Sequence, residues 1–306
     1  MILVGGENLI DFIEGADGRF SANVGGGPFN IAKALARQEV PVGYLTPIST
    51  DDMGNRLADA LLADGVNLLA PRSTAPSSLA LVSLQNGQPS YQFYREKTAE
   101  RQVTATLLNR IIPKHANALQ LGSLAITSGK DADTWAQIFT ACHKRGMFTS
   151  LDPNIRPAFI KNRSKFLARL DWMLGHTDLL KLSDEDLAWI TPDQPPQAAA
   201  EALRAQHNIP LVLLTKGAEG AVAFHNGGKL EVSAPKAEPF KDAVGAGDTF
   251  MGTLLAQLSK RDLLSRNALQ AAKPESLRAV LETAAKAAAI NCTRSGCNPP
   301  TQEELA

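Results

Sequence analysis

The chain has 306 residues, of which 44% are hydrophobic and 20% charged, and its 31 Lys and Arg residues balance its 31 Asp and Glu residues. This composition is ordinary for a soluble enzyme and argues against long disorder, and the balanced charge gives no reason to expect a partner nucleic acid or membrane. Three cysteines without a metal-ligand spacing indicate a reducing compartment, so we expect a cytoplasmic protein without a signal peptide or a membrane span.

The N-terminal half alternates strands and helices, with two hairpins between them. Residues 1–5 form an apolar run that predicts a buried strand, and the stretches 8–15 and 18–26 predict a hairpin around residues 16–18. Apolar spacing then predicts, in chain order, a helix at 27–40, a strand at 41–49 and a helix at 51–66. A second hairpin signal follows, in which 77–84 and 89–96 bracket the turn sequence 85–88.

The C-terminal half continues the alternation. In chain order we expect a strand at 118–126, a helix at 131–147, a strand at 148–155, a strand leading into a helix at 178–190, a strand–turn–strand unit at 210–224, and helices at 248–258 and 275–292. This order predicts an α/β fold with a mainly parallel central sheet flanked by helices. We expect one domain, 1–306, whose hairpins at about 8–24 and 78–97 form a small β-lid over the carboxyl ends of the strands.

The stretch from Asp242 to Phe250 places three small residues, Gly245, Ala246 and Gly247, directly before Asp248 at a predicted helix start. Small residues let a ligand approach the backbone, and the free N–H groups of a first helical turn favour an anion such as phosphate. A carboxylate at this place would repel the anion unless it removes a proton from an attacking hydroxyl. On these residues alone, a helix-capping role for Asp248 is equally compatible.

Three segments together resemble the ribokinase-like (PfkB) carbohydrate kinases. Residues 242–250 (DAVGAGDTF) resemble the C-terminal signature of that family, 24–38 (VGGGPFNIAKALARQ) its N-terminal signature, and 213–224 (LLTKGAEGAVAF) its nucleotide-binding segment. The segments occur in the family's order, and the resemblance extends over essentially the whole chain. It implies a ribokinase-like sheet with a β-lid, ATP as phosphoryl donor, and Mg²⁺.

The resemblance also implies roles for individual residues. Asp248 matches the general base, and Gly245, Ala246 and Gly247 match the anion hole for the transferring phosphoryl group. The positions that match the sugar site are Asp11, Gly26, Gly27 and Asn30. The positions that match the nucleotide site are Lys181, Ser183, Thr215, Gly217 and Gly220.

Two cation sites follow from the same resemblance. The segment KLSDEDL resembles the N-x-x-E motif that organises Mg²⁺, with Ser183 in place of the asparagine and Asp186, or Glu185 one residue earlier, in place of the glutamate. A solvated acidic helix start is the alternative for residues 184–186. A monovalent cation, K⁺, would lie among Asp242, Val244, Asn291, Arg294, Gly296 and Pro300.

Three details resemble fructokinases more than other members of the family. Gly122-Ser123 stands where ribokinases carry a glutamate, Arg95 lies in a lid segment of the fructokinase type, and Arg156 lies in a D-x-N-x-R segment. Two arginine forks that face one cleft would bind sugar hydroxyls, phosphates or a substrate carboxylate. We therefore expect D-fructose as acceptor, and fructose 6-phosphate and ADP as products.

Several alternatives stay open on the sequence. A kinase for 2-keto-3-deoxygluconate shares the D-x-N-x-R pattern, and a nucleoside is another possible acceptor. A non-catalytic sugar-binding regulator on the same fold would have no need for Asp248. A dinucleotide-dependent oxidoreductase would need a phosphate-binding fingerprint after the first strand, and the sequence has none. The expected partners are a sugar, ATP and a second copy of the chain that pairs through the lid.

Overall fold

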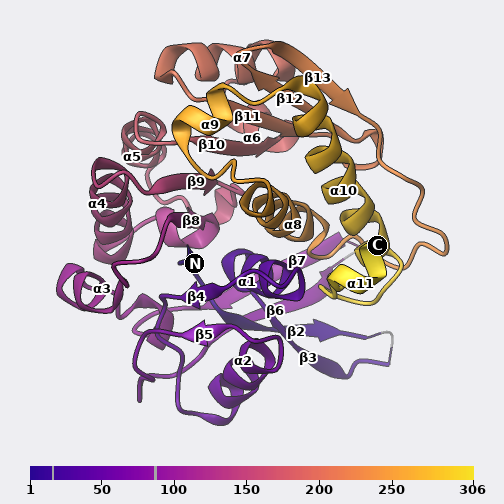
Figure 1. The fold of residues 1–306 in the computed structure, drawn as a ribbon. Coiled ribbons are helices and arrows are strands. Elements are labelled where there is room, and N and C mark those ends of the chain that lie inside the picture. Colours follow the sequence, from indigo (N-terminus) through magenta and orange to yellow (C-terminus); the bar gives the residue numbers. More distant parts are fainter. Residues whose placement is uncertain (16, 86–87) are drawn as a thin grey trace.

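The computed structural model describes residues 1–15, 17–85 and 88–306, which form two β-sheets and the helices around them (Figure 1). The larger sheet has nine strands in the order β13-β12-β11-β10-β9-β8-β1-β4-β5. Its strands are β1 (Ile2–Val4), β4 (Val42–Tyr44), β5 (Asn67–Leu68), β8 (Ala118–Gly122), β9 (Phe148–Asp152), β10 (Leu179–Ser183), β11 (Leu211–Thr215), β12 (Ala221–His225) and β13 (Gly228–Val232). All pairs from β5 to β11 are parallel, and β12 and β13 add an antiparallel edge.

Helices cover both faces of this sheet, which confirms the predicted α/β fold (Figure 1). One hydrophobic core receives side chains from α1 (Gly27–Arg37), α2 (Asp52–Ala63), α8 (Ala246–Lys260), α9 (Arg266–Gln270) and α10 (Pro274–Cys292). The other receives them from α3 (Ala105–Ile111), α4 (Lys130–Lys144), α5 (Arg163–Leu174), α6 (Asp184–Ile190) and α7 (Pro196–His207). The remaining short helices are η1 (Ala99–Arg101), η2 (Ser123–Ile126), η3 (Pro157–Phe159), η4 (Gly217–Glu219) and α11 (Gln302–Leu305).

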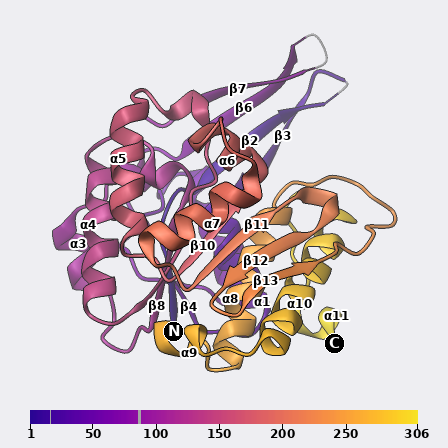
Figure 2. The same ribbon diagram turned by 90° about the horizontal axis from the view of Figure 1, so that it is seen from above.

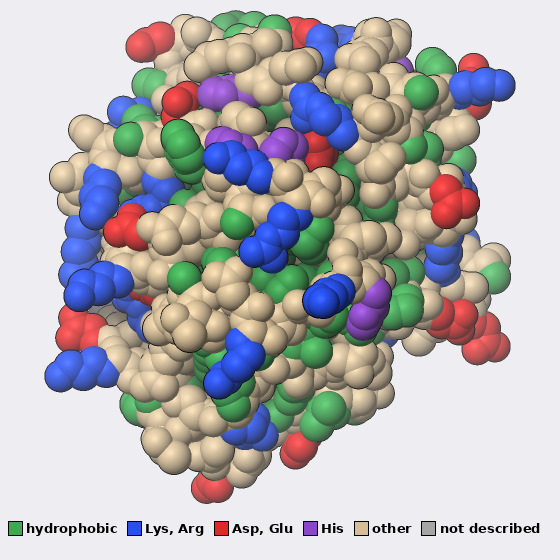
Figure 3. Space-filling model, turned by 60° about the vertical axis from the view of Figure 1, so that its left-hand side comes forward, with side chains coloured by type: hydrophobic (Ala, Val, Ile, Leu, Met, Phe, Trp, Pro, Cys, Tyr) green, Lys and Arg blue, Asp and Glu red, His purple; other side chains and the backbone are tan. Residues whose placement is uncertain are grey.

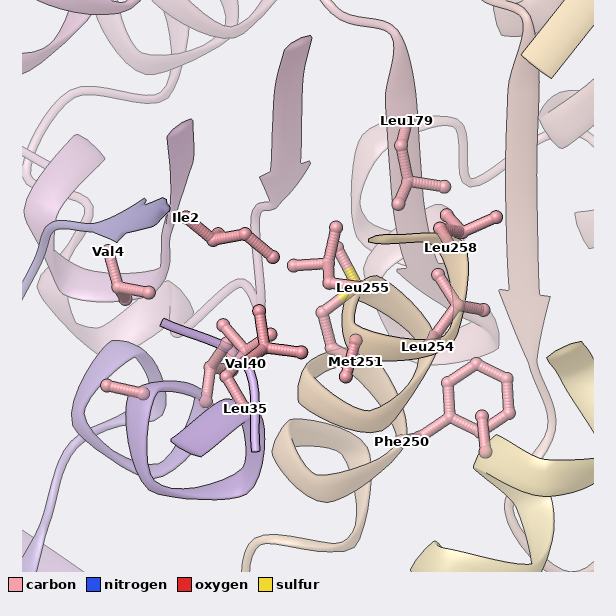
Figure 4. Close-up of a cluster of buried hydrophobic side chains, with 14 of the residues drawn as sticks. Ile2, Val4, Leu35, Val40, Leu179, Phe250, Met251, Leu254, Leu255 and Leu258 are labelled. Atoms are coloured by element: carbon pink, nitrogen blue, oxygen red, sulfur yellow. The ribbon is translucent and has the colours of Figure 1, made fainter. Parts of the chain in front are cut away.

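Alternation along β1 explains why this central strand is apolar at every residue. Ile2 and Val4 of β1 enter the first core, whereas Leu3 between them enters the second. Because both faces of the sheet are covered by helices, apolar side chains are favoured on both sides of β1. Figure 4 shows the first core, where Ile2 of β1 points toward Leu255 of α8.

Four strands form the second, smaller sheet, in the order β3-β2-β6-β7. They are β2 (Leu9–Glu14), β3 (Phe20–Gly25), β6 (Ser78–Gln85) and β7 (Gln88–Tyr94). The two predicted hairpins are both present, and they join into one sheet because β2 pairs in parallel with β6. Residue 16 of the first predicted turn and residues 86–87 of the second lie outside the described residues. Figure 2 shows this sheet extending away from the central one.

One predicted strand is shorter than expected. The apolar run 118–126 predicts a single strand, but β8 ends at Gly122 and the 3₁₀ helix η2 follows. The change of direction occurs at Ser123, whose φ of 55° is incompatible with a continuing strand. The turn leaves Ser123 at the carboxyl edge of the sheet, where ligands bind in folds of this kind.

The distribution of surface charge and the hydropathy of the helices agree with the balanced charge and moderate hydrophobicity of the sequence. On the face seen in Figure 3, Lys and Arg side chains are dispersed among neutral and hydrophobic ones and do not gather into a stripe. In the described part of the chain, no helix has both the length and the hydropathy needed to cross a membrane.

Helices α1 and α8 pack so closely that one position must be glycine. An ideal Cβ on Gly252 would lie 2.6 Å from the Ala34 Cβ and 2.8 Å from the Ile31 carbonyl oxygen. Both distances are shorter than real contacts allow, so any side chain at this position forces the two helices apart.

Gly252→Ala is therefore expected to lower the free energy of unfolding by about 1–3 kcal/mol, the usual penalty for overpacking a tight interface. Urea denaturation of the purified variant measures this. Gly175→Ala is the matched control, because Gly175 has an ordinary φ of −62° and its Cβ would have 3.6 Å to the nearest atom. Equal stability of both variants would contradict the close packing.

Candidate active site

Asp248 lies in the first turn of α8 and is buried, with 8% of its surface exposed. The residue in the N-cap position is Gly245, and the Asp248 side chain does not cap the helix. Instead, its Oδ2 accepts a hydrogen bond of 2.8 Å from the Asn30 Nδ2. Because Asn30 belongs to α1, this bond joins two signature segments that are 218 residues apart.

The pKa of Asp248 is raised to about 7, chiefly by burial and in part by the nearby carboxylate of Asp152. The hydrogen bond from Asn30 and the positive charges of Lys181 and Arg156 act in the opposite direction and lower this pKa. A carboxylate with a pKa near neutral is a much better proton acceptor than an ordinary aspartate. Asp248 is therefore suited to remove a proton from a hydroxyl group at physiological pH.

The two glycines before Asp248 differ in how much space a side chain would have. Gly245 has a φ of 71°, and an ideal Cβ there would overlap the Cys297 side chain. Gly247 is less confined, because its Cβ would lie 3.6 Å from the Lys181 Nζ, an ordinary contact. The N–H groups of Gly247 and Asp248 have no acceptor within the helix, since they belong to its first turn. Free N–H groups at a helix start, here next to Lys181, are the kind of group that binds an anion.

Lys181 forms a buried ion pair with Asp152 at the ends of neighbouring strands. The Lys181 Nζ lies 2.8 Å from the Asp152 Oδ2, and the exposed fractions of the two side chains are 6% and 2%. The parallel register of β9 and β10, which pairs Leu180 with Leu151, brings the following residues side by side. Burial raises the pKa of Asp152.

A small pocket adjoins these groups. Its lining residues are Gly27, Pro28, Ile31, Gln120, Gly122, Ser123, Asp152, Asn154 and Asp248. Ser123 and Asn154 both have positive φ angles, of 55° and 39°, which non-glycine residues seldom adopt. Such strain is typical of functional sites. The pocket therefore joins the N-terminus of α1, the ends of β8 and β9, and Asp248.

The four residues predicted to bind the sugar lie around the N-terminus of α1. Asn30 is buried against Asp248, and the Gly27 N–H donates to the Glu7 Oε1 at 3.0 Å. Asp11 lies on β2 of the small sheet, next to Gly25 and so beside Gly26. Burial and the charge of Glu7 raise the pKa of Asp11 to about 6.

The two arginines predicted to face one cleft have different environments. Arg95 is buried, and its Nε and Nη2 donate to the two oxygens of Glu100 at 2.8 and 3.1 Å. Glu100 also accepts hydrogen bonds from Ser78 and Thr98, so it holds the base of the β6–β7 hairpin. Arg156 is exposed, and its positive charge acts to lower the pKa values of Asp152 and Asp248. Of the two guanidinium groups, Arg156 is thus the more accessible to a ligand.

The residues predicted to bind the nucleotide lie at the ends of β10 and β11. Ser183 pairs with Thr215 as the last residues of the two strands, and η4 follows with Gly217 and Gly220 at its ends. The Lys216 N–H closes this turn by donating to the Gly220 carbonyl at 2.8 Å. This turn places the backbone of residues 215–217 beside the end of β10, the strand that contains Lys181.

The acidic residues 184–186 are not equivalent. Asp186 is buried, and its two oxygens accept hydrogen bonds from the backbone N–H groups of Ser183 at 2.8 Å and Ile155 at 2.7 Å. Together with the Ser183 hydroxyl it forms a capping box for α6. Asp184 and Glu185 are exposed, as expected for a solvated helix start. In residues 1–15, 17–85 and 88–306, no cluster of three or more potential metal-binding side chains occurs.

The segments predicted to bind a monovalent cation do come together. Asp242 accepts hydrogen bonds of 2.9 Å from the N–H groups of Val244 and Gly296, and the Asn291 Nδ2 donates to the Val244 carbonyl at 2.8 Å. Arg294 follows α10, and the Pro300 carbonyl accepts from the Gln38 side chain at 3.0 Å. Cys297 in this loop packs against Gly245, and burial raises the pKa of its thiol to about 12.

Sequence analysis assigned no role to Asp152, Asn154, Glu7 and Glu100, although all four are close to the predicted site residues. A weak signal existed for Asp152 and Asn154, because they lie in the polar end of the predicted strand 148–155 and in the D-x-N-x-R segment. Glu7 and Glu100 gave none, since their partners depend on how the small sheet meets the rest of the chain.

Comparisons with known proteins show the family and confirm the fold. The family model of pfkB carbohydrate kinases matches residues 1–304. A fructokinase of Rhizobium leguminosarum bv. trifolii is 36% identical over 287 residues, which cover 91% of this chain and 86% of that protein. A fructokinase of Escherichia coli is 28% identical over 305 residues, covering 98% and 96%. The crystal structure of a fructokinase with bound ATP from Xylella fastidiosa has a TM-score of 0.91 at 27% identity, covering 99% and 96%.

Substitutions at the two glycines should separate anion binding from folding. Gly247→Ala is expected to fold with a melting temperature close to that of the wild type, because its methyl group fits. The methyl group would occupy the approach to the helix end, so turnover with ATP and sugar should fall by about 10²-fold, the scale of one lost charge-stabilising donor.

Gly245→Ala should instead lower the melting temperature, because of its φ of 71° and the overlap with Cys297. Thermal melts and initial rates on both purified variants measure the two effects. A fully active Gly247→Ala variant would show that no anion binds at this helix end.

Proposed function

Because the chain belongs to the pfkB family of carbohydrate kinases, we propose that it is an ATP-dependent fructokinase, which converts D-fructose and ATP to fructose 6-phosphate and ADP. One observation carries this proposal: the buried carboxylate of Asp248, with a pKa raised to about 7, lies directly beside an anion-binding helix end. The similarity to fructokinases of Rhizobium leguminosarum and Escherichia coli supports fructose as the acceptor.

Asp248 is the proposed general base. In its ionised form it accepts the proton of the sugar hydroxyl as that oxygen attacks the γ-phosphorus of ATP. The hydrogen bond from Asn30 fixes the carboxylate through Oδ2, which leaves Oδ1 for the hydroxyl. The neighbouring N–H groups of Gly247 and Asp248 stabilise the negative charge of the transferring phosphoryl group.

The small sheet is the proposed lid, and the pocket beside Asp248 is the proposed sugar site. Gln120, Ser123 and Asn154 give it neutral hydrogen-bonding groups, which suit the hydroxyl groups of a sugar. Asp11 on β2 would contact the sugar from the lid side. Closure of the lid would exclude water, which otherwise competes with the sugar for the phosphoryl group.

ATP is proposed to lie along the β11–η4 turn, with Lys181 near its terminal phosphate. The residues present fit a Mg²⁺ ion that is held mainly by phosphates and water, as is usual for kinases, because the described residues contain no cluster of three or more potential metal-binding side chains. Glu185, which is exposed, suits this role better than Asp186, whose oxygens already bind two N–H groups. Bound Mg²⁺ would neutralise charge on the phosphates.

A K⁺ ion is proposed to bind near the loop from Asp242 to Val244. Backbone carbonyls are the typical ligands of such an ion, and the hydrogen bonds of Asp242 and Asn291 hold the backbone of Val244 close to that of Gly296. The loop leads directly into the helix end of α8, so the ion would stabilise the anion-binding turn.

The environment of Arg95 favours a neutral sugar over 2-keto-3-deoxygluconate. A sugar acid needs a cation for its carboxylate, and Glu100 already neutralises Arg95 through two hydrogen bonds. A non-catalytic sugar-binding protein is not favoured either, because burial of an unneeded carboxylate such as Asp248 would only destabilise the fold. A homodimer through the lid stays a prediction, supported by the exposed side chains of Ile13, Phe20 and Tyr94.

Asp248 should give the enzyme a characteristic pH dependence. Only the ionised carboxylate accepts a proton, so kcat/KM for fructose should fall as the pH decreases through about 7. Asp248→Asn should lower kcat by about 10²-fold or more and abolish this acidic limb. Calorimetric titration with ADP controls for an intact nucleotide site. A variant with near-normal turnover would remove Asp248 from the mechanism.

Fructose should be the preferred acceptor. We expect its kcat/KM to exceed that of 2-keto-3-deoxygluconate, ribose and adenosine by at least about 10-fold, which corresponds to about 1.4 kcal/mol in transition-state binding. Coupled assays of ADP release at saturating ATP, each with and without K⁺, measure this preference. Higher efficiency with 2-keto-3-deoxygluconate would overturn the assignment and point to Arg156 as its carboxylate partner.

A further inference from the structure

Lys181 and Asp152 form an ion pair, but the mechanism described so far gives the Asp152 carboxylate no role. Lys181 is a proposed ATP contact, but Asp152 is only its neighbour, at 2.8 Å between Nζ and Oδ2. Both side chains are almost completely buried, with exposed fractions of 6% and 2%. The pair lies at the carboxyl edge of the sheet and Asp152 lines the pocket beside Asp248.

Stability gives no reason for this arrangement. Moving two charges out of water is costly, and a buried ion pair seldom stabilises a protein more than two apolar residues would. In addition, the Asp152 Oδ1 is buried and, among the described residues, has no hydrogen-bond partner, which costs about 1–3 kcal/mol. Glu100 is different, because both of its oxygens accept hydrogen bonds from Arg95. The incomplete bonding of Asp152 points to a functional cause.

The position of the Lys181 ammonium group gives the functional reason for the ion pair. Lysine has a long, flexible side chain, so its charge needs a partner to stay in one place. Here the Nζ lies at ordinary contact distance, 3.6 Å, from the place where a Cβ on Gly247 would be. The carboxylate of Asp152 thus keeps the ammonium group beside the helix end that receives the phosphoryl group.

Two other carboxylates compete for the same ammonium group. Asp248 and Asp186 both attract Lys181 electrostatically. Asp186 is occupied by backbone N–H groups, so Asp248 is the competitor that matters. If Lys181 formed an ion pair with Asp248, it would stabilise the ionised carboxylate and weaken it as a base. Asp152 prevents this by offering Lys181 a closer partner.

We propose that Asp152 is a positioning residue for phosphoryl transfer: it holds the Lys181 ammonium group against the Gly245–Gly247 turn and away from Asp248. Lys181 keeps its protons throughout, and the proton of the attacking hydroxyl goes to Asp248. The ammonium group donates a hydrogen bond to the phosphoryl oxygens as their charge increases. This inference rests on the kinase activity proposed above.

A double-mutant cycle tests the proposal. Asp152→Asn and Lys181→Met are each expected to lower kcat by about 10- to 100-fold, whereas the KM for fructose should change by less than about 3-fold. If Asp152 acts through Lys181, the double variant should be no more than about 3-fold slower than Lys181→Met alone. Multiplicative losses, or an unchanged kcat in Asp152→Asn, would overturn the proposal.

Asp131→Asn is the matched control, because Asp131 is a buried aspartate paired with Arg101 at 2.7 Å but does not line the pocket. It should leave kcat unchanged, and an equal loss of kcat in this variant would assign the effect to general destabilisation. If Asp152→Asn does not fold, Asp152→Glu takes its place, since it keeps the charge but displaces Lys181. An unaltered kcat in Asp152→Glu would then count against the proposal.

Different results would contradict the proposed kinase activity and the positioning role of Asp152. A wild-type chain that phosphorylates no sugar would contradict the proposed function, and this inference with it. An active wild type combined with independent effects of Asp152 and Lys181 would contradict only the positioning role.

Discussion

The close contact between α1 and α8 is the constraint on which the rest of the structure depends. Gly252 lets the two helices approach until their N-terminal ends lie at the same edge of the sheet. Only then can Asn30, from the first signature segment, reach Asp248, from the last. The parallel strands between them bring Asp152 and Lys181 to that edge as well. The site is therefore a product of packing between segments distant in the sequence.

Much of the fold was predictable because it follows from local patterns. Apolar runs separated by helical spacing predicted the central sheet, and the small residues before Asp248 predicted an anion-binding helix end. The predictions that were incomplete concern side-chain partners. The attachment of Arg95 to Glu100 has no sequence signature. The spacing of Ser183 and Asp186 is a local capping pattern, but the second partner of Asp186, the Ile155 N–H, comes from a distant segment and could not be read from the sequence. The register of β9 and β10 likewise decides the pair of Asp152 and Lys181.

Charges at the site are distributed so that each has a defined neighbour. Arg95 is matched by Glu100 and Lys181 by Asp152, whereas Asp248 has a neutral partner, Asn30. An amide orients a carboxylate without neutralising it, so Asp248 keeps its basicity while the cations are assigned elsewhere. The choice of asparagine rather than lysine or arginine beside Asp248 is thus consistent with proton transfer, and a salt bridge at the same place would oppose it.

The packing of Cys297 against Gly245 has a consequence for resistance to oxidants. Thiols react with peroxides and electrophiles as thiolates, and burial raises the pKa of Cys297 to about 12, so at neutral pH almost none of it is ionised. Any sulfenic acid or adduct formed there would enlarge a side chain that already touches the Gly245 turn. The contact that shapes the turn thus also lowers the reactivity of the partly buried thiol beside it.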